Sequence, residues 1–136
     1  MIRVDEEDFS VDEIVSKLKG REVGGIVVFL GIVKGFREGE AVNEMLIEAY
    51  KKIAEEKLGS IRETALKKFD IVDAIIIHRV GRLKPSDNIV IVATSARSRE
   101  DAFKACSWMI DEVKTQAPIW KKEFTPRGER WVKEAS

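Results

Sequence analysis

Apolar residues along the chain change their spacing several times between the period of a strand and the period of a helix. No low-complexity linker or internal repeat interrupts this alternation, which favours a single α/β domain over residues 1–136. Strands or extended segments are predicted at residues 2–4, 24–33, 41–50, 71–80, 88–94, 119–124 and 130–132. Residues 41–50 are predicted to pair with residues 24–33 in an antiparallel hairpin, with residues 34–40 at its tip.

Capping residues mark the starts of two predicted helices. Ser10–Glu13 and Ser98–Asp101 each place a serine three residues before an acidic side chain, which is the spacing of a capping box. They predict one helix to about residue 18 and another that ends before Pro118, since a proline disfavours the α conformation of the residue before it. A further helix is predicted from about Lys51 to Phe69. The apolar face of the last helix comprises Ala102, Phe103, Cys106, Met109, Ile110 and Val113.

The charge balance and the cysteine content exclude several classes of protein. With 24 basic and 24 acidic residues the formal net charge is zero, so the chain has no overall field that would attract nucleic acid or an anionic membrane. No apolar run approaches the ~20 residues that span a bilayer. Because Cys106 is the single cysteine, an intrachain disulfide and a cysteine-rich metal cluster are both excluded. We therefore expect a cytoplasmic protein that needs no metal or cofactor.

Self-sufficient nucleophilic chemistry has little support in the sequence. Such an enzyme needs an activated nucleophile beside a base, which is usually a histidine. The only histidine, His78, lies in a strongly apolar predicted strand, where a structural role with Arg79 facing outward is favoured. Cys106 lies on an apolar helix face, which indicates an inert buried thiol. The absence of GxSxG, HExxH, CxxC and P-loop motifs further disfavours triad, zinc and nucleotide chemistry.

Cationic side chains gather at two predicted positions. Lys34 and Arg37 lie on the hairpin tip, and Arg97 and Arg99 flank Ser98 at the start of the last helix. A helix start offers free backbone N–H groups and the positive end of the helix dipole, so arginines there add to an anion site. A second interpretation is that both arginines are exposed and pair with the acidic residues that follow them, at positions 100 and 101. Both interpretations remain open at this point.

Three lysines surround Pro118 and Trp120 where the last helix ends. Lys114 suits the negative end of the helix dipole. Lys121 and Lys122 alternate along an extended segment, so that one faces the core and the other faces water. A lysine held against Trp120 and Pro118 in a partly dry pocket has a destabilised ammonium, which makes it a better acid or nucleophile. The pattern indicates a local basic pocket for a small phosphorylated or otherwise anionic ligand.

Six blocks that extend over nearly the whole chain carry a resemblance to a known family, namely Gly25–Lys34, Ile77–Leu83, Thr94–Ala96, Trp108–Lys114, Ala117–Glu123 and Gly128–Trp131. In this order they resemble the large, catalytic subunit of molybdopterin synthase. The string Val-Lys-Thr-Gln-Ala-Pro-Ile-Trp-Lys-Lys-Glu at Val113–Glu123 resembles the pattern LKTxxPxWKxE, which is specific to that family. The resemblance implies an α/β hammerhead-type domain with an added antiparallel β subdomain.

The resemblance also implies a sulfur-transfer reaction. Members of that family convert cyclic pyranopterin monophosphate into molybdopterin by installing two sulfurs as a dithiolene. The sulfur arrives as the C-terminal Gly-Gly thiocarboxylate of a small ubiquitin-like carrier subunit, so that the partner brings the nucleophile. A central homodimer with one carrier at each end, a heterotetramer, is therefore expected for this chain.

Site residues are implied by the positions that match the family. Lys114 and Lys121 match the two family lysines that work at the reacting carbons and the carrier tail, and we expect electrostatic and acid catalysis from them. Lys34 matches a family arginine, so it keeps the charge but loses the bidentate contact to phosphate. The expected substrate-binding residues are Ile32, Val33, Lys34, Arg37, Arg97, Ser98, Arg99, Lys122 and Glu123.

One segment departs from the family pattern. The family reads Ser-Ala-His-Arg before the last helix, whereas Ser95–Arg99 has an extra residue and no histidine. Either Arg97 or Arg99 then takes the place of the family residues, and a general-base role for that histidine does not carry over. This departure leaves a second hypothesis, a non-catalytic carrier-binding module of the same fold. A nucleic-acid-binding function is disfavoured by the zero net charge and the lack of an aromatic stacking surface.

Overall fold

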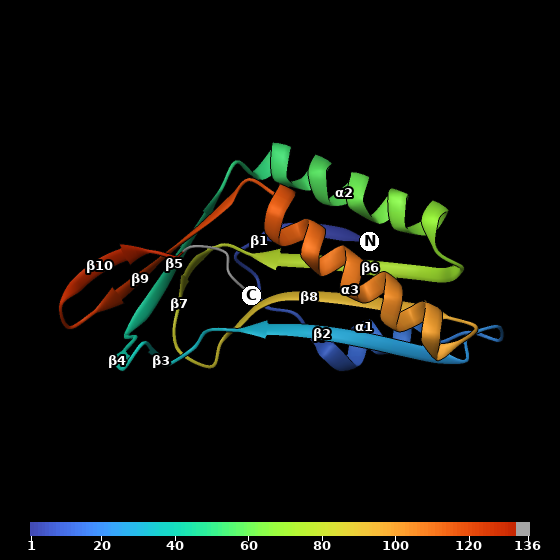
Figure 1. Ribbon diagram of the computed structural model, residues 1–136, viewed down its shortest axis with the longest axis horizontal. Coiled ribbons are helices and arrows are strands. Elements are labelled where there is room, and N and C mark those ends of the chain that lie inside the picture. Colours follow the sequence, from blue (N-terminus) through green and yellow to red (C-terminus); the bar gives the residue numbers. More distant parts are fainter. Residues whose placement is uncertain (133–136) are drawn as a thin grey trace.

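The computed structural model describes residues 1–132, in which strands and helices alternate along the chain (Figure 1). In chain order the elements are β1 (Ile2–Asp5), α1 (Val11–Leu18), β2 (Gly25–Ile32), β3 (Phe36–Arg37), β4 (Glu40–Ala41), β5 (Glu44–Ala49), α2 (Lys51–Lys68), β6 (Ile71–Arg79), β7 (Gly81–Leu83), β8 (Asn88–Ala96), α3 (Arg99–Gln116), β9 (Ile119–Thr125) and β10 (Gly128–Trp131). The helices occupy the predicted positions.

Four strands form a central sheet in the order β1-β6-β8-β2. β1 runs parallel to β6, and the other neighbours in this sheet are antiparallel. Helices α2 and α3 cover one face of the central sheet and α1 covers the other (Figure 1). Alternation along β6 explains both contacts, because Ile76 packs in the cluster under α2 and α3 while Ile75 and Ile77 pack with residues of α1.

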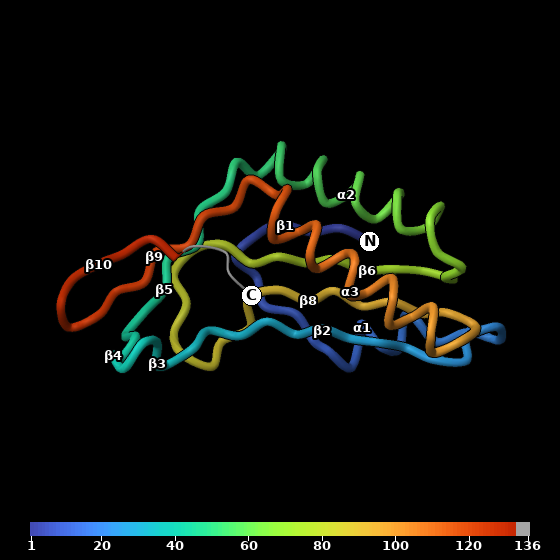
Figure 2. The backbone as a smooth tube through the Cα atoms, in the orientation of Figure 1, coloured from blue at the N-terminus to red at the C-terminus, as the bar shows by residue number. Residues whose placement is uncertain are grey.

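A second sheet, here called the side sheet, has the order β10-β9-β5-β7 and is antiparallel throughout. It extends from one end of the central sheet, beside the small β3–β4 hairpin (Figure 2). Met45, Ile47 and Leu83 of the side sheet belong to the same buried cluster as residues of β6 and α3, so the two sheets share one core. This arrangement confirms the expected α/β fold with an antiparallel β subdomain.

The hairpin predicted between the strands β2 and β5 is wrong. β2 pairs with β8, whereas β5 pairs with β7 and β9. The chain between β2 and β5 closes its own small hairpin, β3–β4, in which Glu38 and Gly39 have φ values of 51° and 77°. The end of β2 is also held by the turn before β8, because the Val33 carbonyl accepts a hydrogen bond of 2.9 Å from the Ser86 N–H. These contacts direct β5 away from β2 and into the side sheet.

Serine side chains begin two of the helices, as predicted. The Ser10 Oγ accepts a hydrogen bond from the Glu13 backbone N–H at 3.2 Å, and the Ser98 Oγ accepts one from the Asp101 N–H at 3.3 Å. Phe103 is 61% exposed, so its predicted place on the buried face of α3 is wrong. No helix within residues 1–132 is long and apolar enough to cross a membrane.

Candidate active site

Lys114 and Lys121 line one pocket, here called the lysine pocket. Lys114 lies in the last turn of α3 and Lys121 lies in β9. The chain between them turns at Pro118, where the Ile119 N–H donates to the Ala117 carbonyl at 2.8 Å. The other residues that line the pocket are His78, Val90, Ile110, Val113 and Ile119. Two lysine side chains therefore line one pocket, and the other described residues that line it are aliphatic except for one histidine.

His78 is 3% exposed and reaches the lysine pocket from β6. Its Nδ1 lies 2.8 Å from the Arg79 carbonyl oxygen. Burial, reinforced by the positive charge of Lys121, lowers the pKa of His78 from 6.5 to about 3, although the hydrogen bond to Arg79 opposes the change. The imidazole is therefore neutral at physiological pH, and the predicted structural role with a hydrogen-bonded ring agrees with this geometry.

The sequence suggested that Arg79 faces outward, but its side chain is mostly buried. Its side chain is 14% exposed. The guanidinium donates to the Glu6 carbonyl from Nε at 3.2 Å and to the Asn88 carbonyl from Nη1 at 3.1 Å. Arg79 thus ties the end of β6 to the chain after β1 and to the start of β8.

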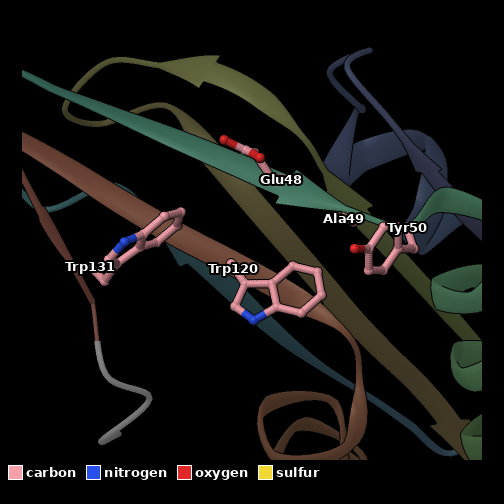
Figure 3. A pocket seen from close by; sticks show the side chains of 5 residues that line it. All are labelled: Glu48, Ala49, Tyr50, Trp120 and Trp131. Atoms are coloured by element: carbon pink, nitrogen blue, oxygen red, sulfur yellow. The ribbon is translucent and has the colours of Figure 1, made fainter.

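Alternation along β9 separates Lys121 from its neighbours Trp120 and Lys122. Trp120 lies on the outer face of the side sheet with Glu48 and Trp131 (Figure 3). Its ring meets that of Tyr50 edge-on, with the centroids 5.4 Å apart. Neither Trp120 nor Pro118 is among the described residues that line the lysine pocket.

Lys122 occupies the outer face of the side sheet. Its Nζ lies 4.6 Å from the centroid of the Trp131 ring and 3.5 Å from a carboxylate oxygen of Glu129. Lys122 is thus not brought together with Lys114 and Lys121, and its expected contact with substrate stays a prediction.

Glu123 lies at the centre of a buried ion-pair cluster on the inner face of β9. Its side chain is 0% exposed. The Arg37 Nε donates to Oε2 at 2.7 Å, and the Arg130 Nε donates to Oε1 at 3.1 Å. Arg130 was not among the expected site residues, because its contact with Glu123 depends on the β9–β10 register, which has no local signal in the sequence. The carboxylate fixes both guanidinium groups at the edge of the side sheet.

The end of β2 lies at the same level of the central sheet as the lysine pocket. Gly31 pairs with Val90, and Val90 pairs in turn with His78. A Cβ atom on Gly31 would lie 2.7 Å from a Val90 methyl carbon, so the strands approach closely there. Beyond this point Val33 is buried, whereas Ile32 and Lys34 are exposed. Their predicted part in binding substrate fits this position and stays a prediction.

The start of α3 lies far from the lysine pocket. Arg97 pairs with Asp70 at 3.1 Å and with Glu22 at 3.3 Å. The sequence left two roles open for the arginines, binding an anion or pairing with the acidic residues at positions 100 and 101. The observed partners of Arg97 are instead acidic residues distant in sequence. Ser98 caps the helix. Because each helical residue adds 1.5 Å, Arg99 lies about 22 Å along α3 from Lys114, and no small ligand contacts both within one chain.

Cys106 is a buried thiol on the inner face of α3. It is 3% exposed, and its S–H donates to the Val92 carbonyl at 3.4 Å. Burial raises the pKa of Cys106 to about 11. The predicted burial of the thiol is confirmed, and its inertness stays a prediction.

Comparisons with known proteins place these features in one family. The sequence model described as MoaE protein matches residues 4–116. The molybdopterin synthase catalytic subunit of Pyrococcus abyssi is 43% identical over 126 residues, which are 93% of this chain and 85% of that protein. The crystal structure of molybdopterin synthase from Staphylococcus aureus has a TM-score of 0.90 at 32% identity and covers 95% of this chain and 94% of that chain.

A more distant structure shares the fold alone. It is a chain in the protein–protein complex of subunits 1 and 2 of molybdopterin-converting factor from Helicobacter pylori. Its TM-score is 0.79 at 18% identity, over 99% of this chain and 92% of that chain.

Proposed function

This chain belongs to the MoaE protein family of molybdopterin synthase catalytic subunits, and from that membership we propose that it installs sulfur on cyclic pyranopterin monophosphate to form the dithiolene of molybdopterin. The observation that carries the proposal is the meeting of Lys114 and Lys121 in one pocket, where the lining residues within the described part of the chain include no serine, threonine or cysteine. Such a pocket supplies positive charge and protons but no sulfur. In this proposal the sulfur comes from outside, and the resemblance to the family implies its source, the C-terminal thiocarboxylate of a small ubiquitin-like carrier.

The two lysines act as electrostatic and acid catalysts in this proposal. An ammonium beside the carrier tail stabilises the oxyanion that forms at the thiocarboxylate carbon, and it protonates an oxygen that departs from the pterin. Four of the residues that line the pocket are aliphatic, namely Val90, Ile110, Val113 and Ile119. Aliphatic walls lower the local dielectric, which makes each ammonium more effective than it would be in water.

The phosphate and the pterin bind beside the lysine pocket. Gly31 pairs with Val90, which lines the lysine pocket. The residues that follow Gly31, namely Ile32, Val33 and Lys34, therefore lie at the end of the central sheet that is next to this pocket. Arg37 approaches from the β3–β4 hairpin and is oriented by Glu123. A fixed guanidinium loses little entropy when it binds a phosphate, so Glu123 supports binding through Arg37.

The arginines at the start of α3 contribute across a homodimer. Because α3 separates them from Lys114 by most of its length, they are too far from Lys114 to contact the same small substrate within one chain. If Arg97 or Arg99 binds the pterin phosphate, a second copy supplies it. The complete assembly is then a homodimer with one carrier at each end, in the cytoplasm.

Complementation in mixed dimers tests this arrangement. A Lys121→Ala chain and an Arg97→Ala, Arg99→Ala chain should each lose activity alone, whereas a random mixture of the two contains dimers with one intact site. Activity should return to about one quarter of the wild-type level when the arginines act across the interface. A mixture that stays inactive would show that the arginines and lysines act within one chain.

The second candidate function is a non-catalytic module that binds the carrier without turnover. The lack of a histidine in Ser95–Arg99 is the observation that favours it. Co-purification with small proteins that end in Gly-Gly identifies the carrier, and assay of the complex with cyclic pyranopterin monophosphate then measures dithiolene formation. Calorimetric titration with the pterin separates the two functions, since an adaptor gives no saturable heat and no product.

A further inference from the structure

Arg130 is a half-buried charged residue that the proposed sulfur transfer leaves without a role. It lies in β10, and its side chain is 32% exposed. The β9–β10 register places it opposite Glu123, on the face of β9 that also carries Lys121. Alternate residues of a strand lie about 7 Å apart on one face. The ion-pair cluster around Glu123 therefore adjoins the lysine pocket, which Lys121 lines.

The guanidinium of Arg130 holds groups from three other strands. Its Nε donates to Oε1 of Glu123 on β9 at 3.1 Å. Its Nη2 donates to the Arg37 carbonyl on β3 at 3.4 Å, and its Nη1 donates to Oε2 of Glu40 on β4 at 3.5 Å. Arg37 and Glu40 pair with each other in the β3–β4 hairpin. One side chain thus fastens both strands of this hairpin to the side sheet.

Arg37 uses its guanidinium differently from Arg130. Its Nε donates to Oε2 of Glu123 at 2.7 Å, and this is the one side-chain hydrogen bond that Arg37 makes within residues 1–132. The two terminal amino groups are then left for a ligand, and such a fork fits the oxygens of a phosphate. Arg130 instead directs all three of its nitrogens to protein groups. Of the two arginines that share Glu123, Arg37 is thus the one suited to bind an anion, and Arg130 the one suited to hold Arg37.

We propose that Arg130 is a positioning residue, which holds the backbone and the side chain of Arg37 so that its guanidinium is presented to the phosphate of the substrate. This inference rests on the proposed function, in which Arg37 binds that phosphate. Arg130 holds the backbone directly through the Arg37 carbonyl, and it holds the side chain through Glu123, whose two carboxylate oxygens are shared between the arginines. Because the Glu123 side chain is fully buried, water competes little for these bonds. A guanidinium fixed in this way loses less entropy on binding, so the affinity for substrate depends on Arg130.

A nitrogen NMR spectrum tests the positioning without an activity assay. The full chain is labelled with ¹⁵N-arginine, and Arg37→Lys assigns the Nε–H resonance of Arg37. Arg130→Lys keeps the charge but loses the fork that reaches three groups. We expect this substitution to shift the Arg37 Nε–H resonance and to speed its exchange with water by about 10-fold or more. An Arg37 resonance whose position and exchange rate ignore Arg130→Lys would overturn the inference.

Arg127→Lys is the matched control for both the spectrum and the kinetics. Arg127 is exposed and lies in the turn between β9 and β10, so it shares the local chain with Arg130 but lies outside the buried cluster. We expect Arg127→Lys to leave the Arg37 resonance and the kinetic constants unchanged. Equal effects of Arg127→Lys and Arg130→Lys would contradict a specific role for Arg130.

Steady-state kinetics with a thiocarboxylated carrier test the consequence for binding. We expect Arg130→Lys to raise KM for cyclic pyranopterin monophosphate about 10-fold, with kcat changed less than about threefold. This split follows because Arg37 binds the phosphate and does not contact the reacting carbons. A loss confined to kcat, or a KM that stays at the wild-type value, would contradict the inference.

A double-mutant cycle separates positioning of Arg37 from a general structural effect. If Arg130 acts through Arg37, Arg130→Lys should raise the KM of an Arg37→Lys chain by less than about twofold, because the guanidinium that Arg130 holds is already gone. The full increase of about 10-fold on that background would show that Arg130 acts independently of Arg37.

The failures of the inference and of the proposed function are distinguishable. If the wild-type chain forms no dithiolene with a thiocarboxylated carrier and the pterin, the proposed function fails, while the Arg37 resonance still decides whether Arg130 holds Arg37. If the wild-type chain is active and the resonance ignores Arg130→Lys, only the role of Arg130 fails.

Discussion

Lys114 and Lys121 face the same pocket although they belong to a helix and to a strand. Their meeting depends on the abrupt end of α3 at Gln116 and on the turn at Pro118. Because β9 then pairs with β5, alternate residues of β9 face the core, and Lys121 is one of them. The position of the second lysine thus follows from strand register, and a one-residue slip of β9 would place Lys122 in the pocket instead.

Replacement of Glu123 should destabilise the fold. Glu123→Gln removes the charge between Arg37 and Arg130, and we expect the free energy of unfolding to fall by about 2 kcal/mol in urea denaturation. Glu129→Gln is the matched control, since Glu129 is 57% exposed and should change stability by less than about 0.5 kcal/mol. Equal effects of the two substitutions would show that the buried cluster contributes no more than a surface pair.

Two glycines should respond to alanine in opposite directions. A Cβ on Gly24 would lie 2.1 Å from the Arg97 carbonyl oxygen, so Gly24→Ala should displace the backbone and cost about 1–3 kcal/mol. Gly59 lies within α2 with no atom within 4 Å of a Cβ position, so Gly59→Ala should stabilise by about 0.5–1 kcal/mol. Thermal unfolding of both variants measures the two signs, and a neutral Gly24→Ala would contradict the close approach at Arg97.

The stability of the protein should depend on pH through His78. In the unfolded chain the imidazole binds a proton near pH 6.5, whereas in the folded chain it does so only near pH 3. The unfolded state therefore binds more protons between these values, and this contribution to stability is complete above pH 6.5 and is lost as the pH falls toward 3. The slope approaches about 1.4 kcal/mol per pH unit.

Urea denaturation at several pH values between 7 and 4 checks this dependence. The matched variant is His78→Gln, which has no titrating ring, and its stability should fall less steeply with acidification than that of the wild-type chain. Parallel curves for the two proteins would mean that His78 titrates normally in the folded state.

Cys106 should be unreactive as long as the chain is folded. The thiolate is the reactive form, and a pKa near 11 instead of 9 leaves about 100-fold less thiolate at neutral pH, in addition to the effect of burial. We expect a thiol reagent such as dithionitrobenzoate to label the folded chain at least about 100-fold more slowly than the urea-unfolded chain. Cys106→Ala should keep its sulfur-transfer activity. Rapid labelling of the folded chain, or loss of activity in a folded Cys106→Ala variant, would contradict this account.

Helix bounds could be predicted from the sequence because their determinants are local. Ser98 accepts a hydrogen bond three residues away, and Pro118 constrains the residue directly before it. Strand pairing could not be predicted in the same way. The β3–β4 hairpin contains Glu38 and Gly39 at positive φ, and it redirects β5 toward β9, which lies far along the chain. Adjacent strands were therefore assumed to pair when they do not.

The pair of lysines in the candidate site was predictable from the sequence, whereas the surroundings of Glu123 and Arg97 were not. Lys114 and Lys121 were expected together and line one pocket. Glu123 was expected to contact substrate, yet its partners are Arg37 and Arg130, which only the register of β10 and the β3–β4 hairpin bring to it. Arg97 was expected at an anion site, and the distance along α3 separates it from the lysines. Contacts between residues far apart in sequence decide the surroundings of Glu123.

The most direct test of the account is dithiolene formation by lysine variants with a thiocarboxylated carrier and cyclic pyranopterin monophosphate. Lys114→Ala and Lys121→Ala should each lower kcat by about 100-fold or more, because each removes a positive charge aimed at the reacting atoms. Lys104→Ala, on the same helix as Lys114 but paired with Glu100 in solvent, should keep kcat within about twofold of wild type. A folded Lys114→Ala, Lys121→Ala double variant with wild-type activity would contradict the assignment of the lysine pocket as the active site.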